Sequence, residues 1–157
     1  MPDYSTLQRP WSKLTLDELY AFLKLRTDVF FVEQRVDETE LDDRDQELET
    51  RHYWIADDQG TAAYLRTLVD AVPEHMDAHR LISRVVVRAD RRGEGLAQKL
   101  IGAVLERHAS EPMLLHAQEY AAALYARFGF EAFGEPYLEA GISHLSMYRA
   151  ADLATAP

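Results

Sequence analysis

The chain contains no cysteine among its 157 residues. Disulfide bonds, thiolate metal sites and a cysteine nucleophile are therefore excluded, and any covalent intermediate would need another side chain. No apolar run approaches the roughly 18 residues that a membrane-spanning helix needs. The first residues, MPDYSTLQRPWSK, hold no apolar stretch of the signal-peptide type. We therefore expect a cytoplasmic protein that makes no contact with a membrane.

Basic residues are fewer than acidic ones. The chain has 17 lysines and arginines against 27 aspartates and glutamates, which gives a formal net charge of −10. Nonspecific binding to nucleic acid requires neutralisation of phosphates, so this charge argues against a nucleic-acid partner. It is compatible with a cationic or amine substrate.

The length is sufficient for one domain with a substantial core. We expect a single domain over residues 1–157, with its core from about Trp11 to Arg149 and a frayed tail over residues 150–157. Helical and strand patterns alternate along the chain, which predicts an α/β fold.

The elements are placed by periodicity and by turn residues. TLDE, Thr15 to Glu18, has the spacing of a capping box and predicts a helix from about Leu16 to Phe31. Two strands are predicted around a turn at Asp58–Gly60, followed by a strand buried on both faces in LISRVVVRA and a helix in LAQKLIGAVLERHA. MLLHAQ predicts another buried strand, and EYAAALYARFGF predicts a helix that stops near Gly129. The last element is a closing hairpin with its turn at Gly141. The hairpin indicates a mixed sheet.

Two segments hold residues that can bind metals. VDETELDDRDQELE carries eight acidic residues and one arginine, but frames beginning at Asp37, Asp42 or Asp43 lack the glycine and glutamate of a calcium loop. We interpret it as a solvated acidic lip that attracts cationic substrates. His75 and His79 are four residues apart, but the surrounding loop residues and the absence of H-E-x-x-H argue against zinc. We predict no metal.

A glycine-rich corner, RRGEGLA, joins a predicted strand to a predicted helix. Glycines allow positive φ and close approach of a ligand, and a helix start offers free N–H groups to phosphate. The corner is either such a phosphate site or a tight turn. The dinucleotide pattern G-x-G-x-x-G fails at Gln98, and no G-K-[S/T] is present, so neither NAD nor ATP is favoured.

Three segments together carry a family resemblance. Arg92-x-x-Gly95-x-Ala97 resembles the acyl-CoA signature of the GNAT N-acetyltransferases, [Q/R]-x-x-G-x-[G/A]. YARFGF, Tyr125 to Phe130, resembles the Y-x-x-x-G-F of that family. The family's N-x-x-A-x-x-[F/L]-Y corresponds to Gln118, Ala121, Leu124 and Tyr125, with glutamine replacing asparagine. LYAFLKLRTDVFFVEQ and YLEAGISHLSMYR resemble the ElaA-like branch, so the resemblance covers about Trp11 to Arg149.

The resemblance implies a GNAT fold, with a central mixed and mostly antiparallel sheet splayed between its fourth and fifth strands. Acetyl-CoA would lie in that opening, and no metal is implied. Backbone groups of three residues would pair with the pantetheine arm, and these are Val85, Val86 and Val87. The pyrophosphate would be held by amides of the corner, and Gln118 occupies another cofactor position. The corner residues are Arg92, Gly93, Glu94, Gly95, Leu96 and Ala97.

The implied reaction moves an acetyl group to a primary amine of a small molecule or peptide by direct attack in a ternary complex. By resemblance, Tyr125 donates a proton to the departing thiolate. A phenol with a pKa near 10 can do so for a thiol with a pKa of about 8.5 when transfer is coupled to cleavage.

The base that deprotonates the amine is not fixed by the motifs. Glu33, His116 and His144 are the candidates, and each histidine could instead be structural. The alternative function is a GNAT-fold module that binds or senses acyl-CoA without turnover. The family also allows a homodimer through the last strands.

Overall fold

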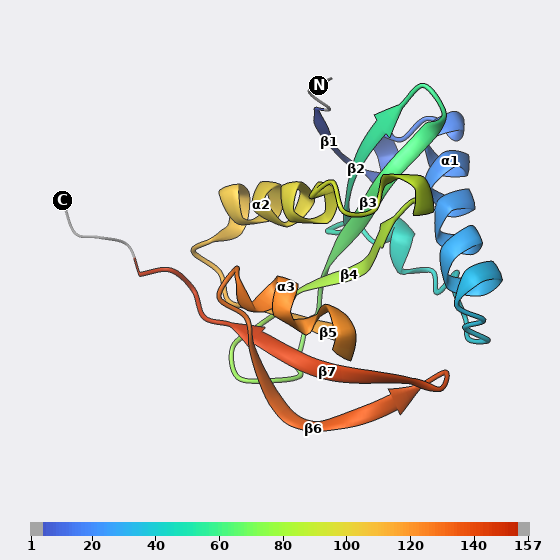
Figure 1. The fold of residues 1–157 in the computed structure, drawn as a ribbon. Coiled ribbons are helices and arrows are strands. Elements are labelled where there is room, and N and C mark those ends of the chain that lie inside the picture. The colour runs from blue at the N-terminus through green and yellow to red at the C-terminus, as the bar shows by residue number, and fades with distance from the viewer. Residues whose placement is uncertain (1–4, 154–157) are drawn as a thin grey trace.

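The computed structural model describes residues 5–153, which form one seven-stranded sheet with helices on both faces (Figure 1). The strand order is β1-β2-β3-β4-β5-β7-β6, and all neighbours are antiparallel except the parallel pair β4–β5. The strands are β1 (Thr6–Pro10), β2 (Arg51–Asp57), β3 (Gly60–Val69), β4 (Arg80–Val87), β5 (Met113–Gln118), β6 (Glu131–Glu139) and β7 (Ile142–Arg149). The helices are α1 (Leu16–Arg26), α2 (Leu96–His108) and α3 (Ala122–Ala126). The predicted α/β fold with a mixed sheet is confirmed.

Alternating side chains in β2 and β3 give each face of the sheet its own core. Tyr53 and Leu65 pack with residues of α2, whereas Trp54 and Tyr64 pack with residues of α1. Figure 1 shows these two helices on opposite faces of the sheet. Within the described residues, no helix is both long enough and apolar enough to cross a membrane.

The first helix begins as predicted and changes its winding near its end. The hydroxyl of Thr15 accepts from the Glu18 amide, and the Glu18 carboxylate accepts from the Thr15 amide, so the capping box is confirmed. From Thr27 to Glu33 the chain continues in wider π-type turns, beyond the predicted end at Phe31. The Thr27 hydroxyl donates to the Leu23 carbonyl at 2.8 Å, and such a bond competes with the regular backbone ladder.

Some predicted boundaries were wrong. The sheet already begins at β1, before Trp11. Its sequence TLQRP gives no strand alternation, and its proline is tolerated because this is an edge strand. The predicted helix after β5 is a 3₁₀ turn (Glu119–Ala121) followed by the short α3. Of the predicted frayed tail, residues 154–157 lie outside the described residues. The Asp152 amide, by contrast, donates to the Ala109 carbonyl at 2.7 Å.

The prediction that β4 is buried on both faces was only partly right. Val86 is 4% exposed, but Val85 and Val87 are half-buried. Arg84 has φ +57°, and Arg84 and Val85 together lie opposite Leu65 of β3. This β-bulge turns the end of β4, and on its other side β5 does not accompany it.

The acidic segment after α1 is not solvated throughout, contrary to prediction. Asp45 is 5% exposed and accepts hydrogen bonds from Arg26 at 2.8 Å and from Arg66 at 3.0 Å. Both arginines are almost completely buried. A buried guanidinium requires paired carboxylates, so the segment folds inward to supply them.

Two further carboxylates of this segment extend the network to the bulge of β4. Asp42 binds Arg66 at 2.6 Å, and Glu40 binds both Arg26 at 2.6 Å and Arg84 at 3.0 Å. The network thus connects α1, the acidic segment, β3 and the bulge.

Asp45→Asn should lower the free energy of unfolding by about 3 kcal/mol, because it leaves two buried guanidiniums short of negative charge. Urea unfolding at pH 7 would measure this loss. The control is Asp28→Asn, which breaks the exposed Lys24–Asp28 pair and should change stability by less than about 0.5 kcal/mol. Equal effects of the two substitutions would contradict a structural role for Asp45.

The stabilities of the wild type and of Asp45→Asn should become similar in acid. Burial alone would raise the pKa of Asp45, but the hydrogen bond and charge of Arg26 lower it overall. The stabilisation is therefore complete above the ordinary aspartate pKa of about 3.9 and is lost as the pH falls through the lowered value. The difference in stability between wild type and Asp45→Asn should narrow below about pH 4.

Candidate functional site

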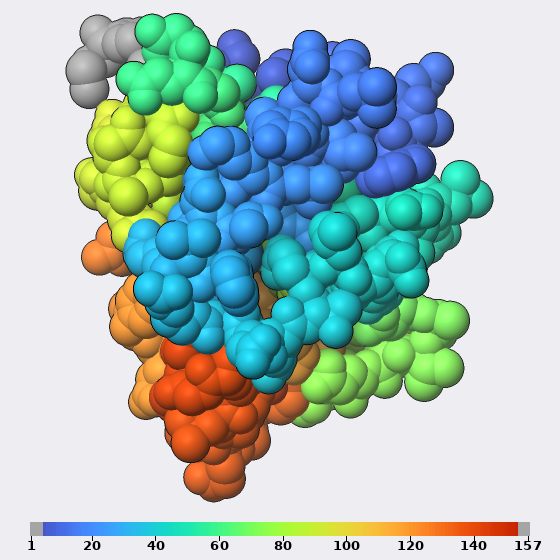
Figure 2. Space-filling model, turned by 90° about the vertical axis from the view of Figure 1, so that its right-hand side faces the viewer, coloured from blue at the N-terminus to red at the C-terminus, as the bar shows by residue number. Residues whose placement is uncertain are grey.

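A cleft opens where β4 and β5 separate. They pair only over Arg80–Ile82 and Met113–Leu115. Beyond this point β4 stays with β3 as far as Val87, and β5 stays with β7 as far as Gln118. The cleft that opens there has a volume of about 1350 Å³ and extends to the segment after α1 and to the β6–β7 hairpin. At the surface, the segment after α1 comes close to the β6–β7 hairpin across this opening (Figure 2).

The β4 wall contains the residues that were expected to pair with pantetheine. Val85, Val86 and Val87 all line the cleft. Val86 and Val87 pair with β3 on one side, and β5 makes no ladder with them on the other. Their cleft side is therefore available to an extended ligand that hydrogen-bonds like a strand.

The glycine-rich corner lies at one end of the cleft. Gly93 and Gly95 have φ values of +82° and +79°, and Gly95 caps α2 without a side chain. The nearest atom to a Cβ added at Gly95 would be 4.0 Å away, so the requirement for glycine is conformational rather than steric. Leu96 and Ala97 also line the cleft, and the first amides of a helix have no partner within it. Of the corner residues, Glu94 is absent from the lining and instead pairs with Arg91 at 2.7 Å.

Arg92 is held by Glu33 across the cleft. Its guanidinium donates to both Glu33 oxygens at 2.7 and 2.8 Å. The hydrogen bond from Arg92 lowers the pKa of Glu33. A carboxylate in this state accepts protons poorly, so the geometry does not favour Glu33 among the candidate bases.

Tyr125 lines the cleft from α3. Its side chain is 6% exposed and lies edge-on to Phe130, with 6.3 Å between the ring centres. Burial raises the pKa of Tyr125, so the phenol keeps its proton throughout the neutral range. A proton donor must be in this state.

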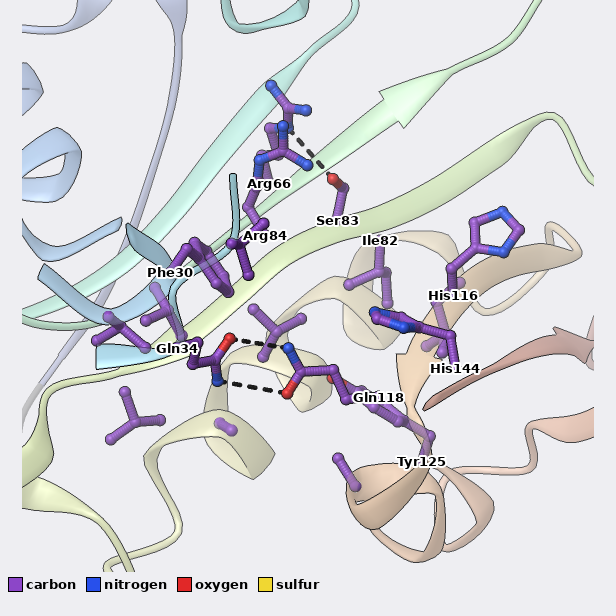
Figure 3. A pocket seen from close by; sticks show the side chains of 18 of the residues that line it. Phe30, Gln34, Arg66, Ile82, Ser83, Arg84, His116, Gln118, Tyr125 and His144 are labelled. Carbon is purple, nitrogen blue, oxygen red and sulfur yellow. Dashed lines mark hydrogen bonds between the residues drawn. The ribbon is translucent and has the colours of Figure 1, made fainter. Parts of the chain in front are cut away.

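Gln118 reaches across the cleft instead of lying along it. Its amide exchanges two hydrogen bonds with the amide of Gln34, at 2.9 and 3.3 Å (Figure 3). This amide pair connects the end of β5 to the segment after α1.

His116 and His144 lie on the face of the sheet opposite α3. Leu115 and Ala117 pack in the core with α2 and α3, so the intervening His116 points to the other face. In the β5–β7 register Ser146 is opposite His116, and His144 is opposite Gln118. Both histidines line the cleft.

The two histidines have different partners. Nδ1 of His116 lies 3.0 Å from the Ser146 hydroxyl, and Nε2 of His116 lies 2.9 Å from the Glu74 carboxylate. His144 Nδ1 donates to the Ile142 carbonyl at 2.7 Å, and its ring stacks on Tyr137. His144 Nε2 is 3.6 Å from Glu139, beyond hydrogen-bonding distance.

Sequence reasoning missed Glu74, Tyr137 and Ser146, which line the cleft beside these histidines. The alternation in ISHLSM could have placed Ser146 on the same face as His144, but no local signal connects Glu74 to β5. The possible zinc ligands beside Glu74 have other contacts. His75 stacks on Phe133, and His79 bonds the Asp70 carbonyl. Among residues 5–153, no group of three such side chains is arranged to hold a metal.

Comparisons with known proteins agree on one family. A family model described as an acetyltransferase (GNAT) domain matches residues 24–150. The chain is 38% identical over 146 residues to a UPF0039 protein of Mycobacterium tuberculosis, covering 91% of this chain and 92% of that protein. It is 34% identical over 145 residues to Protein ElaA of Escherichia coli, covering 88% of this chain and 91% of ElaA.

Two solved structures resemble the chain in both fold and sequence. An acyl-CoA N-acyltransferase from Pseudomonas aeruginosa superposes with a TM-score of 0.84 at 38% identity, covering 94% of this chain and all of that one (100%). Escherichia coli ElaA superposes with a TM-score of 0.83 at 31% identity, covering 94% and 99%.

Proposed function

The chain belongs to the GNAT acetyltransferase family, in its ElaA-like branch, and from this membership we propose that it transfers an acetyl group from acetyl-CoA to a primary amine of a small molecule or peptide. The observation that carries the proposal is the parting of β4 from β5 beside the glycine-rich start of α2. An acyltransferase activity is supported by the family. The choice of acetyl-CoA and of an amine acceptor is our proposal.

The residues of the cleft fit coenzyme A. No strand pairs with one edge of Val85–Val87, and this edge suits the two amides of a pantetheine arm, which can pair with it as a strand would. The corner from Gly93 to Ala97 combines a positive-φ backbone with a helix start, an arrangement that suits a pyrophosphate. Acetyl-CoA supplies the thioester carbonyl carbon that the amine attacks.

The two faces of the sheet divide the chemistry. Tyr125, on the α3 face, gives its proton to the departing thiolate, because burial keeps the phenol neutral until the C–S bond breaks. The amine enters from the opposite face, which carries His116 and His144. Attack is direct, in a ternary complex, and releases coenzyme A and the acetylated amine.

Two measurements on the same protein test this function. Acetyl-CoA at about 100 times its Kd should add about 2.7 kcal/mol of stability and raise the melting temperature by about 5 °C. Free thiol should then form only when a primary amine from a panel of small amines and lysine peptides is added. Stabilisation without thiol release on any amine would favour the alternative, a non-catalytic acyl-CoA-binding module.

Tyr125→Phe should lower kcat about 100-fold and leave acetyl-CoA affinity nearly unchanged, because it removes a proton donor that acts only in the transition state. Thiol-release kinetics and titration calorimetry would measure the two quantities. A variant with the kcat of the wild type would remove Tyr125 from the mechanism.

Glu33→Gln should strengthen coenzyme A binding about two- to five-fold, because Glu33 competes with the ligand's phosphates for the exposed guanidinium of Arg92. Calorimetry at low salt would measure the effect, and Arg92→Gln should weaken binding instead. Weaker binding by Glu33→Gln would show that the ion pair prepares Arg92 for the ligand instead of competing with it.

A further inference from the structure

Three side chains from three separate elements form a continuous hydrogen-bonded line on the face of the sheet opposite α3, from which the amine enters in the proposed function. Ser146 of β7 contacts His116 of β5, and His116 contacts Glu74 of the β3–β4 loop. All three side chains line the cleft, and the Glu74 side chain is 50% exposed. The line therefore ends at a carboxylate that is in contact with solvent.

The chemistry of the partners fixes the direction of these hydrogen bonds. An ionised carboxylate can only accept, so Glu74 requires the proton of His116 to be on Nε2. Nδ1 is then the unprotonated nitrogen, and the Ser146 hydroxyl must donate to it. Neutral imidazole is thus held with its basic nitrogen toward the Ser146 hydroxyl and its N–H toward the Glu74 carboxylate.

The loop that carries Glu74 is fastened to the sheet directly after that residue. His75 stacks on Phe133 of β6 with 3.7 Å between the ring centres. The Tyr148 hydroxyl of β7 donates to Asp77 at 2.7 Å, and Ala78 is fully buried. The packing of this loop therefore fixes the backbone of Glu74 close to His116.

We propose that Ser146, His116 and Glu74 form the proton relay that deprotonates the acceptor amine, a proposal that rests on the proposed acetyl transfer. As the amine nitrogen bonds to the thioester carbon, it passes a proton to the Ser146 oxygen, and the Ser146 hydroxyl proton moves to His116 Nδ1. The C–S bond breaks, and the thiolate takes the proton of Tyr125. His116 then releases its proton to solvent, and Tyr125 takes up a proton from solvent. Glu74 positions the imidazole and stabilises its charged form.

The other candidate bases lack this arrangement. Glu33 is committed to Arg92. His144 has a neutral carbonyl as its hydrogen-bond partner and no carboxylate within hydrogen-bonding distance. The titratable groups that share this surface with His116 are Glu74 from the β3–β4 loop, Tyr137 and Glu139 from β6, and His144 from β7.

The first test does not depend on an acceptor. NMR of the imidazole nitrogens at neutral pH should find His116 with its proton on Nε2, in the wild type and in Glu135→Gln. That control removes one exposed carboxylate from β6 that does not line the cleft. Glu74→Gln should lose the fixed tautomer. A proton on Nδ1 of His116 in the wild type would overturn the relay.

The second test uses the best amine from the thiol-release panel. Ser146→Ala should lower kcat about 10-fold, and His116→Gln should lower it about 100-fold. The affinity for acetyl-CoA should be unchanged in both variants. Glu74→Gln should lower kcat, because a neutral amide no longer holds the imidazole in the orientation and tautomer of the wild type. Glu135→Gln should leave kcat unchanged.

The outcomes separate the relay from the function on which it rests. Wild-type protein that binds acetyl-CoA but acetylates no amine would overturn the proposed function. Turnover by Glu74→Gln with the kcat of the wild type would overturn the relay alone, as would loss of activity only in His144→Gln. A stable gain of one acetyl group on Ser146, detected by mass spectrometry, would replace the relay with a nucleophilic serine.

Discussion

The separation of β4 from β5 is the feature on which the site depends. The two strands share a parallel ladder only up to Ile82 and Leu115, and each then follows its antiparallel neighbour. A sheet interior normally satisfies both edges of every strand, and here no strand pairs with one edge of Val85–Val87. The same separation makes both faces of the sheet accessible from one cleft, so a donor and an acceptor can meet from opposite sides.

The buried ion network keeps the β4 wall in place. Arg84 adopts a left-handed conformation that is costly for a residue with a side chain, and its guanidinium is held by Glu40 and by the Thr39 carbonyl. Glu40 also binds Arg26, which connects the bulge to α1 and to the buried Asp45. The sequence predicted that this acidic segment attracts a cationic substrate. Much of its charge instead neutralises the protein's own arginines.

The parts of the site that could be predicted are those encoded within short segments. The corner from Arg92 to Ala97 and the Tyr125 segment carry local spacing rules, because a strand–turn–helix and a short helix determine where each residue lies. Contacts between distant segments have no such rule. Glu74 and His116 are 42 positions apart, and the burial of Asp45 depends on two arginines from other elements. The strand β1 was missed for a related reason, since an edge strand needs no alternating pattern.

We propose above that the edge of β4 and the start of α2 together hold acyl-CoA. Amide hydrogen exchange with and without acetyl-CoA is the decisive measurement, because it reports on the backbone groups themselves. We expect slower exchange at Val85–Val87 and Gly93–Ala97, with no change in β1 and β2. Binding of acetyl-CoA that leaves exchange at these two segments unchanged, or that protects other segments instead, would contradict it.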